Sequence, residues 1–384
     1  MMDKIFFILE VLDKYPSIWK IEDVISQNLA YRLLAKANFW RITQLIYFAN
    51  LSISSLTSHN MKKTILLITS LSITFNAALG VKPGGKKEWL DYEDAKKDDP
   101  DFSIQGEYGS AKKGGAKWGV QVVALGNGKF DAFILEGGLP GAGWDRTKSR
   151  TKTSGTAAAL KSGDGKLTAV IEDGKITVSN DGKKAAVLPR IERESPTLGQ
   201  KAPKGAIILF DGSNTDEWHN AKMYKDRLMA ETKSKRKFRD YQCHIEVMTT
   251  YEPFDRGQGR SNSGVYHQGR FETQVLDSFG LEGRMNEFGG IYSIAAPKLN
   301  MCFPPLRWQT YDVDFAAAKF EGDKKVKNAF ITVRHNGVII HDNQELGHTT
   351  TAAPIRKYDD TPGFLYFQGH GNRVMYRNVW VLEK

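Results

Sequence analysis

The sequence predicts an all-β protein in which a small β domain precedes a β-sandwich or jelly roll. Short runs of alternating apolar and polar residues follow one another after residue 100, and no long helical period interrupts them. Asn-Gly and Asp-Gly pairs separate several of these runs, and such pairs form tight hairpin turns that need positive φ. The 384 residues include 36 glycines and many aromatic residues, which also favours β structure.

The first hundred residues are expected to lie outside both domains. Residues 61–80 (MKKTILLITSLSITFNAALG) have a basic start, an apolar centre and a small-residue end, which is typical of a secretory signal peptide. The apolar centre is too short for a transmembrane helix. We therefore interpret residues 1–60 as an over-extended N-terminus, with an amphipathic membrane-surface helix as the alternative. Residues 81–100 are rich in Gly, Lys and Asp and are predicted to form a polar leader.

The small β domain is expected over residues 101–191, and its first strand at Phe102–Tyr108. Residues 192–204 are charged, contain two prolines and lack periodicity, so they are predicted to form a linker. Strands resume at Ala206–Phe210 and continue to the end of the chain, which places the second domain at residues 205–384. The turns expected within the two domains are Asn127-Gly128, Asp173-Gly174, Asp181-Gly182 and Asn336-Gly337.

Charge and cysteine content exclude several classes of function. The formal net charge is +10, but the lysines and arginines are spread along the chain without a nucleic-acid-binding signature, so we expect no nucleic-acid partner. Cys243 and Cys302 are the only cysteines, too few for a disulfide framework, and their spacing matches no metal site. Cys243 alternates with Ile245 and Val247 and is expected to be a free thiol in the core.

The most informative stretch is residues 256–280, RGQGRSNSGVYHQGRFETQVLDSFG. It predicts a polar loop and then two strands joined at Gln268-Gly269. In the second strand Glu272 and Gln274 are two residues apart and therefore share a face, opposite Phe271 and Val275. The loop before the strands supplies polar side chains that could join this cluster, Arg256, Arg260 and Asn262.

Several segments of the second domain together resemble one known family. They are LFDG at 209–212 with Trp218, YQCHIEV at 241–247, residues 256–277, NMCFPP at 300–305 with residues 308–311, HNGV at 335–338, and QGHGNRVMYRNVW at 368–380. In this order they resemble the 3-keto-disaccharide hydrolase family over residues 205–384. The resemblance implies a concanavalin-A-like jelly roll and activity on 3-keto-glycosides, as hydrolase, as 1,2-lyase or as hydratase of the resulting 2-hydroxy-3-keto-glucal.

That chemistry needs a base, because a ketone at carbon 3 acidifies the hydrogen at carbon 2. Its removal lets the glycosidic oxygen leave, and water then adds across the double bond to complete a net hydrolysis. Glu272 is the expected base; the alternative is a solvent-facing strand carboxylate. Glu246 is a second catalytic candidate if its strand lies beside that of Glu272, since paired carboxylates can divide acid and base roles. His370, flanked by glycines, is the third, and an exposed, idle histidine is its alternative.

The expected substrate-binding residues are polar groups around the base. Arginine presents several fixed donors that could stabilise an enolate or hold hydroxyls. Four of the candidates also have a structural alternative: bonds to loop carbonyls for the two arginines, turn formation for Asn262, and a cross-strand amide for Gln274. The full set is Arg256, Arg260, Asn262, Gln274, Glu287 and Gln368.

The sequence requires no cofactor, although a divalent cation bound by Glu272, Glu246 or His370 could polarise the ketone. We expect a carbohydrate substrate, a secreted or periplasmic location and no transmembrane anchor in the mature chain. The main alternative is a non-catalytic, lectin-like carbohydrate-binding module, since the same sandwich serves lectins. An ordinary glycosidase would need two carboxylates close together, and Glu246 and Glu272 lie on separate strands. A cell-surface adhesion protein is a further alternative.

Overall fold

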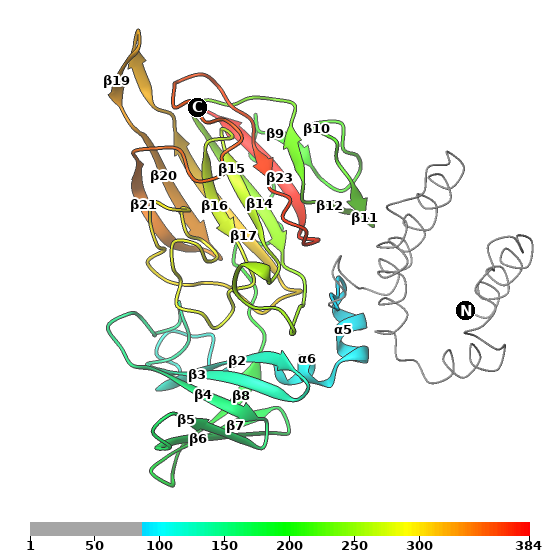
Figure 1. Ribbon diagram of the computed structural model, residues 1–384, viewed down its shortest axis with the longest axis vertical. Helices are drawn as coiled ribbons and strands as arrows, with labels where there is room; N and C mark the ends of the chain where they lie inside the picture. The colour runs from blue at the N-terminus through cyan, green and yellow to red at the C-terminus, as the bar shows by residue number, and fades with distance from the viewer. Residues whose placement is uncertain (1–86) are drawn as a thin grey trace, which may run out of the picture. The chain divides into compact units, whose positions relative to one another are not determined.

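The structure is a computed structural model and describes residues 87–384 (Figure 1). The expected signal peptide at 61–80 and the segment at 1–60 lie outside the described residues. Within residues 87–384 no helix has the length and apolarity needed to span a bilayer. The all-β prediction is confirmed: an eight-stranded antiparallel barrel is followed by two facing antiparallel sheets.

The barrel occupies the predicted small β domain, and pairing of β1 with β8 closes it. Asn127, Asp173 and Asp181 have positive φ and form its expected hairpin turns. The apolar side chains of alternate barrel positions fill one core. The strands are β1 (Gly106–Tyr108), β2 (Trp118–Gly126), β3 (Lys129–Glu136), β4 (Arg150–Thr156), β5 (Ala159–Ser162), β6 (Leu167–Glu172), β7 (Lys175–Asn180) and β8 (Lys183–Ile191).

Two short helices precede the barrel, α5 (Tyr92–Asp98) and α6 (Pro100–Ile104). The strand expected from Phe102 therefore begins only at Gly106. Pro100 is compatible with the first turn of a helix, and the Asp99 carboxylate caps that turn by accepting from the Asp101 N–H at 3.1 Å. The predicted polar leader is thus folded in its described part, where Ala95 and Trp89 pack into the barrel core.

The second domain consists of a five-stranded and an eight-stranded sheet. In spatial order, the smaller sheet contains β10 (Trp218–His219), β13 (Thr232–Ser234), β22 (Tyr366–Phe367), β15 (Ser263–His267) and β16 (Phe271–Val275). The larger contains β11 (Met223–Tyr224), β12 (Arg227–Met229), β23 (Met375–Glu383), β14 (Tyr241–Met248), β17 (Trp308–Ala316), β20 (Ala329–His335) and β21 (Val338–Leu346), with β9 (Ile207–Phe210) paired to β23. A separate ribbon joins β18 (Lys319–Glu321) and β19 (Lys324–Lys327).

The core of the second domain lies between the two sheets, so each sheet has one inner and one outer face. Cys243, Ile245 and Val247 of β14 point into this core, as do Val265 of β15 and Phe271 of β16. Both cysteines are buried and unpaired, as the sequence predicts. The side chains between these inner residues must point outward, which places polar residues on the two outer faces.

The predicted linker lies against the outer face of the larger sheet. The Gly199 N–H donates to Glu246 Oε1 at 2.6 Å, and the Thr197 hydroxyl donates to Asp312 Oδ2 at 2.7 Å. Asn378 and Trp380 of β23 both donate to the carbonyl of Gln200. Residues 195–200 therefore pack against this sheet and do not form an exposed linker.

Candidate functional site

The hairpin of β15 and β16 positions the candidate base on the outer face of the five-stranded sheet. The sequence predicts a two-residue loop at Gln268-Gly269, which would pair Glu272 with Val265. The structure adds Arg270 to the loop, and the register pairs Glu272 with Tyr266. The Arg270 side chain is buried and donates to carbonyls of Lys357 and Thr361, which accounts for its place in the loop. Tyr266 thus enters the site although sequence reasoning missed it.

Glu272 is a buried carboxyl with a single hydroxyl donor. Only 3% of the residue is exposed, and the Tyr266 hydroxyl donates to its Oε2 at 2.7 Å. Burial raises the pKa of Glu272 to about 7 from an ordinary value of 4.5, and the hydrogen bond from Tyr266 lowers it only in part. The carboxyl is therefore poised to gain or lose a proton near neutral pH.

Side-chain amides line the same face next to Glu272. With its nitrogen turned toward the carboxyl, Gln274 donates to Glu272 Oε1 at 2.7 Å. Asn262 Nδ2 donates to the Gln258 carbonyl at 2.9 Å and lies beside the Gln274 amide. The structure therefore brings together Glu272, Gln274 and Asn262, and it adds Gln258, which the sequence did not single out.

Gly264 provides the space in which the Glu272 carboxyl lies. It pairs with Gln274 across the hairpin, and a Cβ built on it would overlap Glu272 Oε1. The sequence signal for this role was present, because Gly264 and Tyr266 alternate with the inward-facing Val265. It could be read only with the correct hairpin register.

Gln368 and His370 follow β22, the neighbour of β15. Gln368 Nε2 donates to the Tyr266 hydroxyl at 3.2 Å, so Gln368 reaches the site through Tyr266. His370 is exposed on the loop beyond, and no hydrogen bond or ion pair within residues 87–384 joins it to Glu272. The structure therefore associates Gln368, and not His370, with the carboxyl.

Glu246 does not share a face with Glu272. Its strand β14 pairs with β17 and β23 in the larger sheet, whereas β16 belongs to the smaller one. Because both carboxylates point away from the common core, that core separates them. Glu246 is instead bound by Arg377 Nε at 2.7 Å and Asn378 Nδ2 at 2.9 Å. The expectation of a paired acid and base from these two residues is not met.

The arginines and Glu287 hold loops in place. Arg260 Nε pairs with Asp277 Oδ2 at 2.6 Å, and its Nη1 donates to the carbonyl of Ala124 in the barrel. Arg256 donates to carbonyls within its own loop and to Leu125 of the barrel. Glu287 Oε2 accepts from the N–H groups of Gly283 and Arg284. These contacts correspond to the structural alternatives and place no guanidinium beside Glu272.

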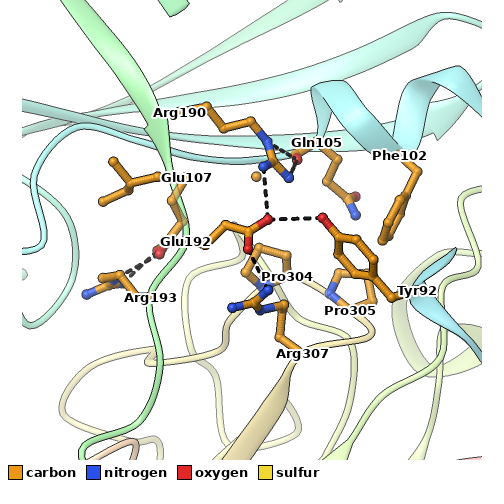
Figure 2. A pocket seen from close by; sticks show the side chains of 12 residues that line it. Tyr92, Phe102, Gln105, Glu107, Arg190, Glu192, Arg193, Pro304, Pro305 and Arg307 are labelled. Atoms are coloured by element: carbon orange, nitrogen blue, oxygen red, sulfur yellow. Dashed lines mark hydrogen bonds and ion pairs between the residues drawn. The ribbon is translucent and has the colours of Figure 1, made fainter. Parts of the chain in front are cut away.

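Two further observations on the described residues concern metal-ligating side chains and a small cavity between the domains. Within residues 87–384 no group of three or more His, Cys, Asp and Glu side chains is arranged to hold a metal ion. A cavity of about 20 Å³ at the junction of barrel and sandwich has room for about one water, and Figure 2 shows the side chains that line it. There Glu192 accepts from Tyr92 at 3.0 Å and from Arg307 at 2.7 Å. These bonds join the domains and leave no space for a substrate.

Comparison with known proteins identifies a family for the second domain. Residues 205–382 match the profile of the 3-keto-alpha-glucoside-1,2-lyase-like domain. The second domain of this chain belongs to that family. The match ends at the linker and does not include the barrel. The lyase-like domain thus carries Glu272, Tyr266 and the amide residues.

Solved structures with similarity to the chain include three described as a "putative glycosyl hydrolase" from Parabacteroides distasonis. One is 28% identical, covers 48% of this chain and 85% of its own, and has a TM-score of 0.43. The other two are each 17% identical and cover 47% of this chain, with 94% and 99% of their own chains covered and TM-scores of 0.36 and 0.34. No curated protein matches the chain.

Proposed function

We propose that the lyase-like domain cleaves 3-keto-glycosides by elimination and hydration, with Glu272 as the base. The observation that carries this proposal is the burial of that carboxyl, which raises its pKa to about 7. A general base is most effective when its pKa lies near the working pH. The family match supports the substrate class, because a 3-keto-glucoside 1,2-lyase acts by this kind of elimination.

In the proposed reaction, ionised Glu272 takes the proton from carbon 2 and the electron pair forms an enolate with the oxygen on carbon 3. Collapse of the enolate restores the ketone, forms the double bond between carbons 1 and 2, and expels the glycosidic oxygen, which takes up a proton from solvent. Water then adds its oxygen to carbon 1 as a hydroxyl and releases its other proton to solvent, while carbon 2 regains a proton from neutral Glu272. Glu272 ends ionised, and the net result is hydrolysis.

The neighbouring polar groups are suited to holding the sugar during these steps. Amide N–H groups of Gln274 and Asn262 can donate to the oxygen on carbon 3 as it gains charge. Gln368 and Tyr266 form a donor chain that ends on the carboxyl. We propose that these residues orient the ketose ring, and that Glu246 and His370 take no part.

A sharp test uses the full chain with three substrates: a 3-keto-disaccharide, the same compound deuterated at carbon 2, and the unoxidised parent disaccharide. We expect turnover of the keto compound, slower turnover of the deuterated one, and none of the parent. Equal rates on keto compound and parent would defeat the elimination mechanism. Glu321→Gln on the exposed ribbon strand β18 serves as a variant that should leave all three rates unchanged.

The proposal needs no organic cofactor, and a divalent cation on the ketone is tested separately. Activity after dialysis against EDTA, and after addition of Mg²⁺ or Mn²⁺, decides between a metal-free and a metal-assisted reaction. We also propose a secreted or periplasmic location from the segment at 61–80. N-terminal sequencing of the native protein should find a start near residue 81, and a peptide from residues 1–60 would contradict it.

A lectin-like module remains the second candidate, because aromatic rings share the outer face with Glu272. Tyr366 of β22 lies beside Tyr266, with ring centroids 5.6 Å apart. Such rings are common in sites that bind ligands without chemistry. Binding of the 3-keto-disaccharide without turnover at any pH from 5 to 9 would favour this candidate over the enzyme.

A further inference from the structure

The outer face of the five-stranded sheet continues well beyond Glu272, and strand register shows which residues lie along it. Residues paired in register point to the same face of a sheet. Glu272 pairs with Tyr266, Tyr266 with Tyr366, and Tyr366 with Lys233. His219 of β10 completes the row by pairing with Lys233. One line of side chains therefore runs from the buried carboxyl across five strands to the open edge.

We propose that Tyr366, Phe364 and Lys233, here called the aromatic–basic strip, bind the leaving-group sugar of the substrate. The proposal rests on the proposed function and extends it from the reacting ring to the rest of the disaccharide. Strands lie about 4.8 Å apart, so Tyr366 is about 10 Å and Lys233 about 14 Å from Glu272 across the sheet. A second sugar linked to a ring at Glu272 would reach this distance.

The strip has the chemistry of a sugar platform. Tyr366 is half-buried. Leu365 points into the core, so its neighbours Phe364 and Tyr366 both point to the outer face. Lys233 Nζ lies 5.2 Å from the centre of the Phe364 ring. Aromatic faces pack against the apolar face of a pyranose, and an ammonium donates to its hydroxyls, so the combination fits a neutral sugar.

The Tyr366 hydroxyl and the Lys233 ammonium have no hydrogen-bond or ion-pair partner in the described part of the chain, residues 87–384. Two arginines of the basic run at residues 233–239, which also contains Lys233, behave differently, since Arg236 pairs with Glu217 and Arg239 with Asp360. Phe367, one residue beyond Tyr366, stacks on Tyr376 in the core. The strip is therefore a polar and aromatic surface on the same sheet face as a buried carboxyl.

The strip can be tested by changing the leaving group. Wild type, Tyr366→Ala and Lys233→Met are compared on a 3-keto-disaccharide and on the methyl glycoside of the same keto sugar. We expect kcat/KM on the disaccharide to fall about tenfold in Tyr366→Ala and a few-fold in Lys233→Met. Rates on the methyl glycoside should stay within about twofold. Lys235→Met, an exposed lysine of the same run outside the strip, should change neither.

Equal losses on both substrates would overturn the strip, because they would place Tyr366 at the reacting ring or in the fold. If wild type turns over neither substrate, the proposed function fails. The affinities of the disaccharide and of the methyl glycoside, measured by calorimetry, then test the strip independently of catalysis. Weaker disaccharide binding by Tyr366→Ala, with methyl glycoside binding unchanged, would then support it. Unchanged binding of the disaccharide would overturn it.

Discussion

Glu246 and Glu272 lie on the outer faces of the two sheets, and both are buried, with exposed fractions of 0% and 3%. Their pKa values nevertheless move in opposite directions. Burial alone would raise the pKa of Glu246, but hydrogen bonds from His244, Asn378, Arg377 and the Gly199 N–H outweigh it and lower the pKa to about 2. Glu272 has only neutral donors, and burial raises its pKa to about 7.

The difference lies in charge compensation. Glu246 is paired with a guanidinium and with His244, whose pKa is raised: burial would lower it, and the bonds to Asp312 and Glu246 reverse that effect. This network holds residues 195–200 against the larger sheet. Glu272 lacks such a partner, so its ionised form is costly and reactive. One carboxylate stabilises the fold, and the other is available for chemistry.

The largest expected effect of breaking this contrast is the loss of activity in Glu272→Gln. We expect kcat to fall about a thousandfold, because the amide cannot accept the carbon-2 proton. The same variant should be more stable than wild type at pH 8, by up to about 3 kcal/mol, since it removes a carboxyl whose ionisation opposes folding. Rate assays and urea unfolding at pH 5 and 8 measure both quantities.

The sign of that stability change follows from the pKa. Glu272 has a higher pKa in the folded state than its ordinary 4.5. Its contribution to the stability of the wild type is therefore complete below pH 4.5 and is lost as the pH rises through about 7. Glu272→Gln should lack this decline. An active variant would remove the base assignment, and an inactive variant that is destabilised at pH 8 would indicate a structural role instead.

Gly264→Ala should disturb Glu272 without changing its chemistry. The added Cβ would overlap Glu272 Oε1 and displace the carboxyl from Tyr266. A shift of about 1 Å in a catalytic group can lower kcat by about a hundredfold, with the larger effect on kcat than on KM. Gly347→Ala, where the new Cβ meets open space, is the matched control. Full activity in Gly264→Ala would show that the position of the carboxyl does not matter.

Glu246→Gln should show the reverse pattern, with reduced stability and unchanged chemistry. Removal of the carboxylate leaves Arg377 without its ion-pair partner and His244 with Asp312 alone, at a cost of about 2 kcal/mol because Arg377 is partly exposed. Wild-type stability from Glu246 should be present above pH 4.5 and lost as the pH falls toward about 2. Urea unfolding measures the loss, and a lower kcat of the folded variant would contradict a purely structural role.

The sequence predicted the fold and the shared face of Glu272 and Gln274 because both depend on local patterns. Asn127, Asp173, Asp181 and Asn336 adopt the positive φ that their hairpin turns require, and the all-β architecture follows from them. The alternation of β16 likewise placed Glu272 and Gln274 on one face. These features need only neighbouring residues, so a sequence contains enough information for them.

Features that depend on strand register or on contacts between distant segments could not be predicted. Tyr266 was missed because one extra loop residue, Arg270, shifts the hairpin register. Glu246 was expected near Glu272. Its strand β14 pairs with β17 and β23, however, and therefore belongs to the other sheet. Arg260 was expected at the substrate, but it binds Asp277 and the Ala124 carbonyl of the barrel. These partners are distant in sequence, so the sequence alone could not show them.

The smallest expected effect concerns the hydroxyl that adjusts the pKa of Glu272. The Tyr266 hydrogen bond favours the ionised carboxyl, so Tyr266→Phe should raise the pKa above its wild-type value of about 7. The pH profile of kcat/KM should rise through about pH 7 in wild type and shift by up to about one unit toward alkaline pH in the variant. Tyr224→Phe is the control, because Tyr224 also donates to a carboxylate, Asp91 at 2.6 Å, away from this site. A profile that shifts in both variants, or in neither, would mean that the Tyr266 hydroxyl does not tune the base.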